Sequence, residues 1–84
     1  MKLTIYKNNK LTKTTEHPEL NRLFEDVGSN LIELLKGYEY NGIESEVTHY
    51  NTLESLEKKI AIFNNCHVAT LKTENEKIDF FINK

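Results

Sequence analysis

The stretch from Pro18 to Gly37 constrains the fold of this chain most strongly, because its large apolar residues recur every three or four positions. That spacing places them on one stripe of an α-helix. The stripe consists of Leu20, Leu23, Phe24, Val27, Leu31, Leu34 and Leu35. The only proline of the chain opens the stretch and a glycine closes it, which is typical of helix ends. We therefore predict a helix over residues 18–36 that packs its stripe on a core.

The centre of this predicted helix contains three poor helix formers in a row, Gly28, Ser29 and Asn30. The apolar stripe nevertheless keeps its phase across them, from Val27 to Leu31. The sequence therefore favours one helix over two, and leaves open whether that helix is kinked.

Two hairpins are predicted at the ends of the chain. Residues 2–7 alternate between apolar and polar side chains, as a half-buried strand does, and threonine-rich residues 11–15 suit a second strand. The asparagines between them tolerate the left-handed backbone angles of a tight turn. Residues 66–72 and 77–82 form the closing pair of strands around a polar turn at residues 73–76.

The middle of the chain predicts one strand and one helix. Asn41-Gly42 is a strong turn signal, and the alternation that follows indicates a strand over residues 43–50. Asn51, followed by Glu54, has the pattern of a helix N-cap with its capping partner. The apolar spacing then predicts a second helix over residues 52–63.

The resulting order, ββ-α-β-α-ββ, predicts an α+β fold, since a hairpin before a helix does not build a run of parallel βαβ units. We expect one mostly antiparallel sheet of about five strands, with two helices packed on one face. The chain of 84 residues should form a single domain, residues 1–84. The predicted sheet side of the core comprises Leu3, Ile5, Val47, Val68, Ile78, Phe80 and Ile82.

Composition narrows the classes of function. The net charge of −2 is too mild to indicate a nucleic-acid binder, and the basic residues include one arginine, Arg22. A single cysteine excludes an internal disulfide, and no stretch is apolar enough for a signal peptide or a membrane span. These features predict a soluble cytoplasmic protein. The abundance of Lys, Asn, Ile and Glu is typical of AT-rich coding sequence, as in low-GC bacteria and their phages.

No motif points to catalysis, a cofactor or a metal. Zinc ligands usually come in pairs two to five residues apart, whereas Cys66 and His67 are adjacent and would point to opposite faces of a strand. Cys66 with His49 would make a nucleophile and base only if neighbouring strands joined them. His17 fits a helix start, and the isolated glycines form no phosphate-binding loop. We expect no enzyme, no cofactor and no metal site.

The segment from Tyr38 to Glu46 is the one patch whose composition suggests more than a structural role. Tyrosine is enriched at protein interfaces, and glutamates would attract a basic partner. The predicted partner-binding residues are Tyr38, Glu39, Tyr40, Glu44, Glu46 and Tyr50. In the alternative, structural interpretation, the tyrosines cover the end of the helix and the glutamates protect an exposed strand edge.

Our first functional hypothesis is a non-enzymatic protein-binding regulator or inhibitor. Its size and composition suit a phage or mobile-element protein that blocks a host enzyme or defence complex, as an anti-CRISPR protein does. The alternative is a small nucleic-acid-binding domain, with Phe81 available for stacking or for a second small core. Its lysine-rich face would comprise Lys58, Lys59, Lys72, Lys77 and Lys84. Either hypothesis is compatible with a homodimer; neither involves a membrane.

Overall fold

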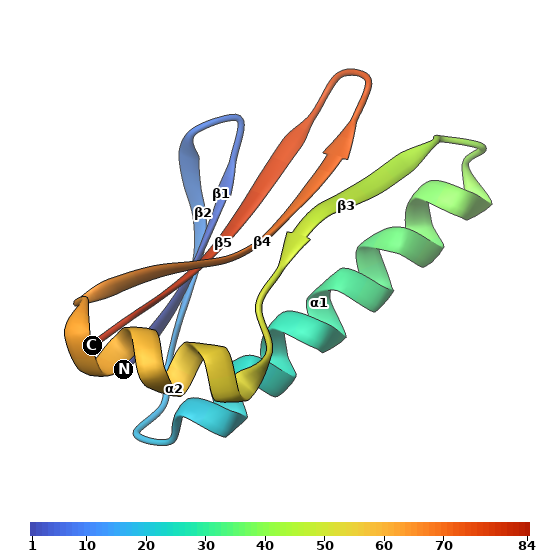
Figure 1. Ribbon diagram of the computed structural model, residues 1–84. Coiled ribbons are helices and arrows are strands. Elements are labelled where there is room, and N and C mark those ends of the chain that lie inside the picture. Colours follow the sequence, from blue (N-terminus) through green and yellow to red (C-terminus); the bar gives the residue numbers. More distant parts are fainter.

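The computed structural model, which describes residues 1–84, confirms the α+β fold. Two helices pack on one face of a five-stranded antiparallel sheet, and the other face carries no covering element (Figure 1). In chain order the elements are β1 (Lys2–Lys7), β2 (Lys10–Glu16), α1 (Leu20–Tyr40), β3 (Ser45–Tyr50), α2 (Leu53–Ile62), β4 (Asn65–Thr73) and β5 (Lys77–Asn83). No helix is both long and apolar enough to cross a membrane.

The sheet order is β2-β1-β5-β4-β3. The last strand of the chain, β5, therefore lies at the centre, where it pairs with β4 of its own hairpin on one side and with β1 of the first hairpin on the other. Lys2 pairs with Asn83, which brings the two ends of the chain together (Figure 1). The β1–β2 turn places Asn8 and Asn9 in the left-handed region, at φ 51° and 67°, as their sequence predicts. The edge strands are β2 and β3.

The core lies between the sheet and the helical stripes. Phe80 on the central strand is fully buried and pairs with Ile5 on one side and Ala69 on the other. Of the sheet residues predicted for this core, all but one are buried. Val47 is the exception, with 37% of its surface exposed, because β3 is an edge strand with a neighbour on one side only.

The first helix is longer than its sequence predicts, and both predicted end signals are wrong. It begins at Leu20, after Pro18, and continues through Gly37 to Tyr40. The side-chain amide of Asn41 donates to the carbonyl of Gly37, and Gly42 adopts φ +70°. Gly42, rather than Gly37, therefore supplies the left-handed residue that ends a helix.

The poor helix formers at the centre of α1 do not interrupt it, so the prediction of one helix is confirmed. A Cβ atom on Gly28 would meet only the hydroxyl of Tyr50, at 3.8 Å, which is an ordinary contact distance. Close packing therefore does not require the glycine. The amide of Asn30 donates to the carbonyl of Asp26, four residues earlier, within the helix.

The two glycines at the end of α1 should respond oppositely to alanine. Gly37→Ala places a better helix former inside the helix, where a Cβ meets nothing within 4 Å. The free energy of unfolding should therefore rise by about 0.5–1 kcal/mol. Gly42→Ala forces a side chain into φ +70° and should destabilise by about 1 kcal/mol. Urea denaturation measures both. Equal effects of the two substitutions would contradict the observed end of the helix.

The start of α2 also differs from the prediction. Thr52, not Asn51, is the N-cap, and its hydroxyl accepts a hydrogen bond from the backbone N–H of Ser55 at 3.2 Å. Asn51 is instead buried, and its side chain contacts the neighbouring strands. Threonine and asparagine are both good N-caps, so the sequence does not distinguish these adjacent positions.

Candidate functional site

Two surfaces of the molecule gather charged, polar or aromatic side chains that the hydrophobic core does not need. The first, which we call the acidic end, lies where the last turn of α1, the start of β3 and the β4–β5 turn meet around a hollow of about 780 Å³. The side chains that define it are Tyr38, Glu44, Glu46, Lys72, Glu74 and Glu76. Four carboxylates therefore share this hollow with one lysine.

Tyr38 and Glu76 are the fixed part of the acidic end. The Tyr38 hydroxyl donates to Glu76 Oε2 at 2.7 Å, and Lys7 Nζ lies 3.3 Å from the other carboxylate oxygen. These two contacts, the tyrosine bond first, hold the pKa of Glu76 below its ordinary value. Burial and the bond to Glu76 raise the pKa of Tyr38 to about 12. Tyr38 thereby joins the end of α1 to the β4–β5 turn.

The pKa shifts of Tyr38 and Glu76 predict how the free energy of unfolding depends on pH. Because the pKa of Tyr38 rises from 10.0 to about 12 on folding, its contribution is present below pH 10 and is lost as the pH rises towards 12. Because the pKa of Glu76 falls, its contribution is lost as the pH drops through its folded value. Tyr38→Phe should reduce the loss above pH 10, leaving the part that the buried Tyr50 ring contributes, and should return the Glu76 pKa towards normal. An NMR titration of the Glu76 side chain in the Tyr38→Phe variant measures the second effect. A Glu76 pKa equal to that of the wild type would contradict the coupling between the two side chains.

The structure separates the predicted partner-binding residues. Tyr38, Glu44 and Glu46 line the hollow. Glu39 and Tyr40 lie in the last turn of α1, beyond the predicted helix end at residue 36, and Tyr40 is 91% exposed. Tyr50 lies at the far end of β3, where its ring contacts Phe24 of α1 at 5.6 Å between centroids, and burial raises its pKa.

The second surface lies on the uncovered face of the sheet, where four rings follow one another across four adjacent strands. Tyr6 on β1 meets Phe81 on β5 edge to face, with centroids 5.7 Å apart. Phe81 contacts the ring of His67 on β4 at 5.0 Å. His67 stacks on His49 of β3 at 5.3 Å, with only 8° between their planes. We call these four side chains the ring row.

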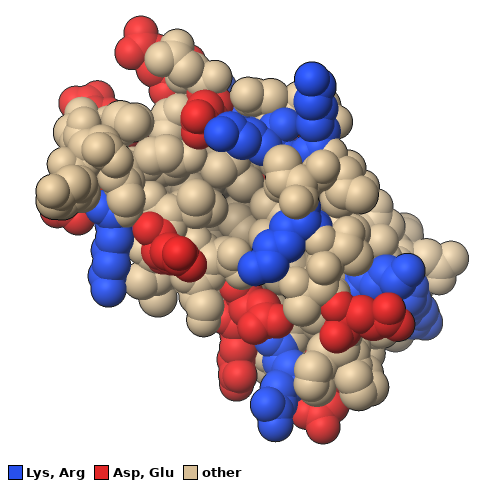
Figure 2. All heavy atoms as spheres, turned by 180° about the vertical axis from the view of Figure 1, so that it is seen from behind, with Lys and Arg blue, Asp and Glu red and all other residues tan.

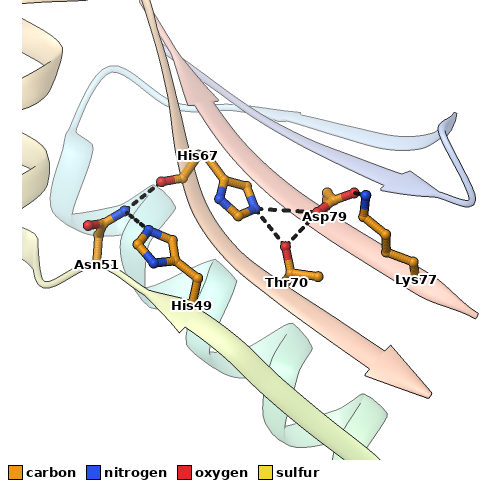
Figure 3. A network of polar contacts seen from close by, with 6 residues as sticks. All are labelled: His49, Asn51, His67, Thr70, Lys77 and Asp79. Carbon is orange, nitrogen blue, oxygen red and sulfur yellow. Dashed lines mark hydrogen bonds and ion pairs between the residues drawn. The ribbon is translucent and has the colours of Figure 1, made fainter. Parts of the chain in front are cut away.

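A polar cluster lies beside the ring row (Figure 3). The buried Thr70 hydroxyl donates to Asp79 Oδ1 at 2.6 Å, so its oxygen accepts from His67 Nε2 at 2.8 Å. The same nitrogen lies 3.3 Å from Asp79 Oδ1, and Lys77 Nζ lies 3.6 Å from the other carboxylate oxygen. His67 therefore carries its proton on Nε2.

Asn51 fixes the other histidine. Lys59 can only donate, and its Nζ lies 2.9 Å from the side-chain oxygen of Asn51, which identifies the oxygen and nitrogen of this amide. The Asn51 nitrogen then donates to the His67 carbonyl at 2.6 Å and to His49 Nε2 at 3.0 Å (Figure 3). His49 accordingly accepts on Nε2, and one amide joins β3, β4 and α2.

Two β-bulges assemble this surface. In β4 the extra residue lies between His67 and Ala69, so His67 and Thr70 share the uncovered face although they are three positions apart. In β3 the extra residue lies between Val47 and His49, which puts His49 on the uncovered face and Tyr50 on the helix side. Strict alternation, on which the sequence analysis relied, puts His49 on the same face as Val47 and Thr70 on the same face as Cys66. The reasoning from sequence therefore missed the ring row.

The structure also shows where the cysteine, histidine and lysine side chains considered in the sequence analysis lie. Cys66 is buried in the core and His67 lies on the opposite face, as predicted, so Cys66 and His49 are not brought together. No group of three or more His, Cys, Asp or Glu side chains is arranged to hold a metal ion. Of the predicted lysine face, Lys58 pairs with Glu54, Lys59 binds Asn51, and Lys77 faces Asp79.

The surface charge does not form one large patch of a single sign on the face shown in Figure 2, where basic and acidic side chains are interspersed. The charge is nevertheless unevenly divided among the elements. Strands β1, β2 and β5 carry five lysines against two carboxylates. The acidic end has the reverse balance.

Comparison with known proteins gave no match: no family model, curated protein or solved structure is significantly similar to this chain.

Proposed function

We propose that this chain is a non-enzymatic protein-binding module, a small regulator or inhibitor that docks its acidic end on a basic surface of another protein. The observation that carries the proposal is the convergence of four glutamates on one hollow from two segments of the chain. Glu44 and Glu46 flank Ser45, the first residue of β3, whereas Glu74 and Glu76 come from the β4–β5 turn, about thirty residues later.

Such a surface carries unbalanced charge in the free protein. The balancing cations are Lys72 in the wall and Lys7, which lies against Glu76. Carboxylates held near one another repel, and a basic partner relieves that repulsion when it binds. The same field raises the rate of encounter with a positive surface and disfavours acidic competitors.

Exposed apolar side chains supply the second component of an interface. Ile43, which lines the hollow, is 44% exposed, and Tyr40 projects from the last turn of α1. Large side chains held on a rigid element lose little entropy when a partner covers them, and tyrosine is frequent among residues that dominate binding energy. The bond between Tyr38 and Glu76 holds the two sides of the hollow in place before any partner arrives.

A module of this kind acts by occupying a surface, which needs no catalytic group. Its size and the AT-rich bias of its composition suit a phage or mobile-element protein that works in the host cytoplasm. We therefore favour an antagonist of a host enzyme or defence complex, in the manner of anti-CRISPR proteins. Nucleic-acid-handling enzymes have the basic surfaces that such an acidic end would cover.

Affinity capture from host lysate with a paired variant tests this function. Tyr40→Ala combined with Glu44→Lys changes two exposed side chains and should leave folding intact. The wild-type chain should retain a partner with a basic surface, and the variant should lose it. Unchanged capture by the variant would refute the acidic end as the docking surface.

A further inference from the structure

Strand β3 forms a free edge of the sheet beside the acidic end. It pairs with β4 on one side only, and its backbone groups that point away from β4 have no backbone hydrogen-bond partner in the chain. Five of its six residues are exposed, so no other element covers this edge. An unpaired edge of this kind is a template on which another extended segment can form one more strand.

The helix side of this edge carries apolar surface that the core does not use. The bulge in β3 puts Val47 and Tyr50 on the same side, where both remain exposed. Helix α1 runs alongside β3, and its residues Phe24 and Gly28 lie against the Tyr50 side chain (Figure 1). Ile32, one turn further along the same row of α1, is exposed as well. A strand added beside β3 would therefore find apolar side chains to cover.

The other edge strand, β2, is protected against such addition. Lys13 pairs with Ile5, whose side chain points into the core, and Lys10 pairs with Lys7, so the β2 lysines lie on the helix side. Lysines on an edge discourage a further strand, because pairing would bring their charges out of water. Strand β3 contains no lysine. Of the two free edges, β3 is the one that suits a partner strand.

The charge around β3 selects the occupant. Because Lys7 already lies against Glu76, the hollow at the acidic end leaves Glu44, Glu46 and Glu74 against one lysine, Lys72. A second copy of this chain would bring the same glutamates against them, and like charges on adjacent strands repel. A segment that alternates basic and apolar residues fits instead, since its side chains point in turn to the glutamates and to the apolar side.

We propose that the free edge of β3 accepts an extended segment of a partner protein as an additional antiparallel or parallel strand. Basic side chains of that segment face the acidic end, and its apolar side chains cover Val47, Tyr50 and Ile32. This inference rests on the proposed function for the basic character of the partner, and adds the way in which the partner is held. Backbone hydrogen bonds to β3 contribute affinity, and the alternation of side chains contributes specificity.

Fluorescence anisotropy with three labelled peptides of equal length tests the proposal. One peptide alternates lysine and valine, the second has proline in place of each valine, and the third is octalysine. The alternating peptide should bind roughly tenfold more tightly than the proline peptide, which has the same charge but cannot complete a strand ladder. Its binding should also persist at high salt, where binding of octalysine is lost.

Two substitutions in the chain test the apolar side of the edge. Val47→Thr combined with Ile32→Ser removes exposed apolar contacts without a change of charge, and should weaken binding of the alternating peptide by roughly tenfold. Binding of octalysine should stay as in the wild type. Leu11→Thr, on the other edge strand, is the matched control and should bind both peptides as the wild type does.

Hydrogen exchange measured by NMR locates the peptide on the wild-type chain. The amides of Ser45–Tyr50 that point away from β4 should exchange slowly only when the alternating peptide is bound. Equal binding of the alternating and proline peptides, or no gain of protection in β3, would overturn the strand site, while binding of octalysine would leave the proposed function standing. Failure of all three peptides to bind would refute both. Protection of β3 that rises with chain concentration in the absence of peptide would identify a second copy as the occupant and would also overturn the proposal.

Discussion

Truncating Phe80 to alanine should lower the free energy of unfolding by about 3–5 kcal/mol, the largest effect we expect of any single substitution. Phe80 is fully buried on the central strand, between Ile5 of β1 and Ala69 of β4. Its removal leaves a cavity in the core cluster between the sheet and the helices, and a small domain cannot easily collapse around it. Domains of this kind are stabilised by only about 5–15 kcal/mol, so the variant should be partly unfolded at physiological temperature.

Urea denaturation followed by circular dichroism measures this loss. Leu11→Ala is the matched control, because Leu11 is also an apolar strand residue but is 57% exposed on the edge strand β2. The control should change stability by less than about 1 kcal/mol. A loss below 1 kcal/mol for Phe80→Ala would mean that the central strand is not packed as described.

Reversing two charges at the acidic end should have the largest effect on binding. Glu44→Lys together with Glu46→Lys replaces attraction for a basic ligand by repulsion at two exposed positions. Exposed pairs contribute about 0.2–1 kcal/mol each, and reversal both removes and opposes that contribution. We expect affinity for an octalysine peptide to fall by roughly tenfold to a hundredfold. The difference should shrink at high salt.

Glu25→Lys with Glu33→Lys is the control for this experiment. Both residues are exposed on α1, outside the hollow, and the pair changes the net charge by the same amount. The control should lose far less affinity, because charges farther than a Debye length, about 10 Å at moderate salt, are screened. Equal losses for the two pairs would show that only net charge matters and that the acidic end is not a site.

The element order was predictable because each element has its own local signal. The apolar stripe of α1, the asparagine turn between β1 and β2, and the alternation of β5 all reflect short-range geometry. The ends of α1 were not predictable in the same way. A glycine in a helix interior costs only about 1 kcal/mol, and the turn beyond Gly37 is held by the packing of Tyr38 on the core and by its bond to Glu76.

The two surfaces were predictable only in part. Tyr38, Glu44 and Glu46 are close in sequence, so their proximity could be anticipated, whereas Glu74 and Glu76 reach the hollow through the β4–β5 turn. The ring row depends on strand order and on two bulges, and neither has a signal in a single sequence. Phe81, opposite in phase to its neighbours on β5, was the one sign of it.

An NMR titration of the labelled chain with unlabelled octalysine tests the central claim, that the acidic end is a docking surface for basic protein partners. The account predicts amide shifts that saturate and cluster at residues 38–46 and 72–76, with the ring row unaffected. It predicts that the same shifts disappear in the variant carrying Glu44→Lys and Glu46→Lys. Shifts spread evenly over all carboxylates of the surface, or clustered on another face, would contradict it.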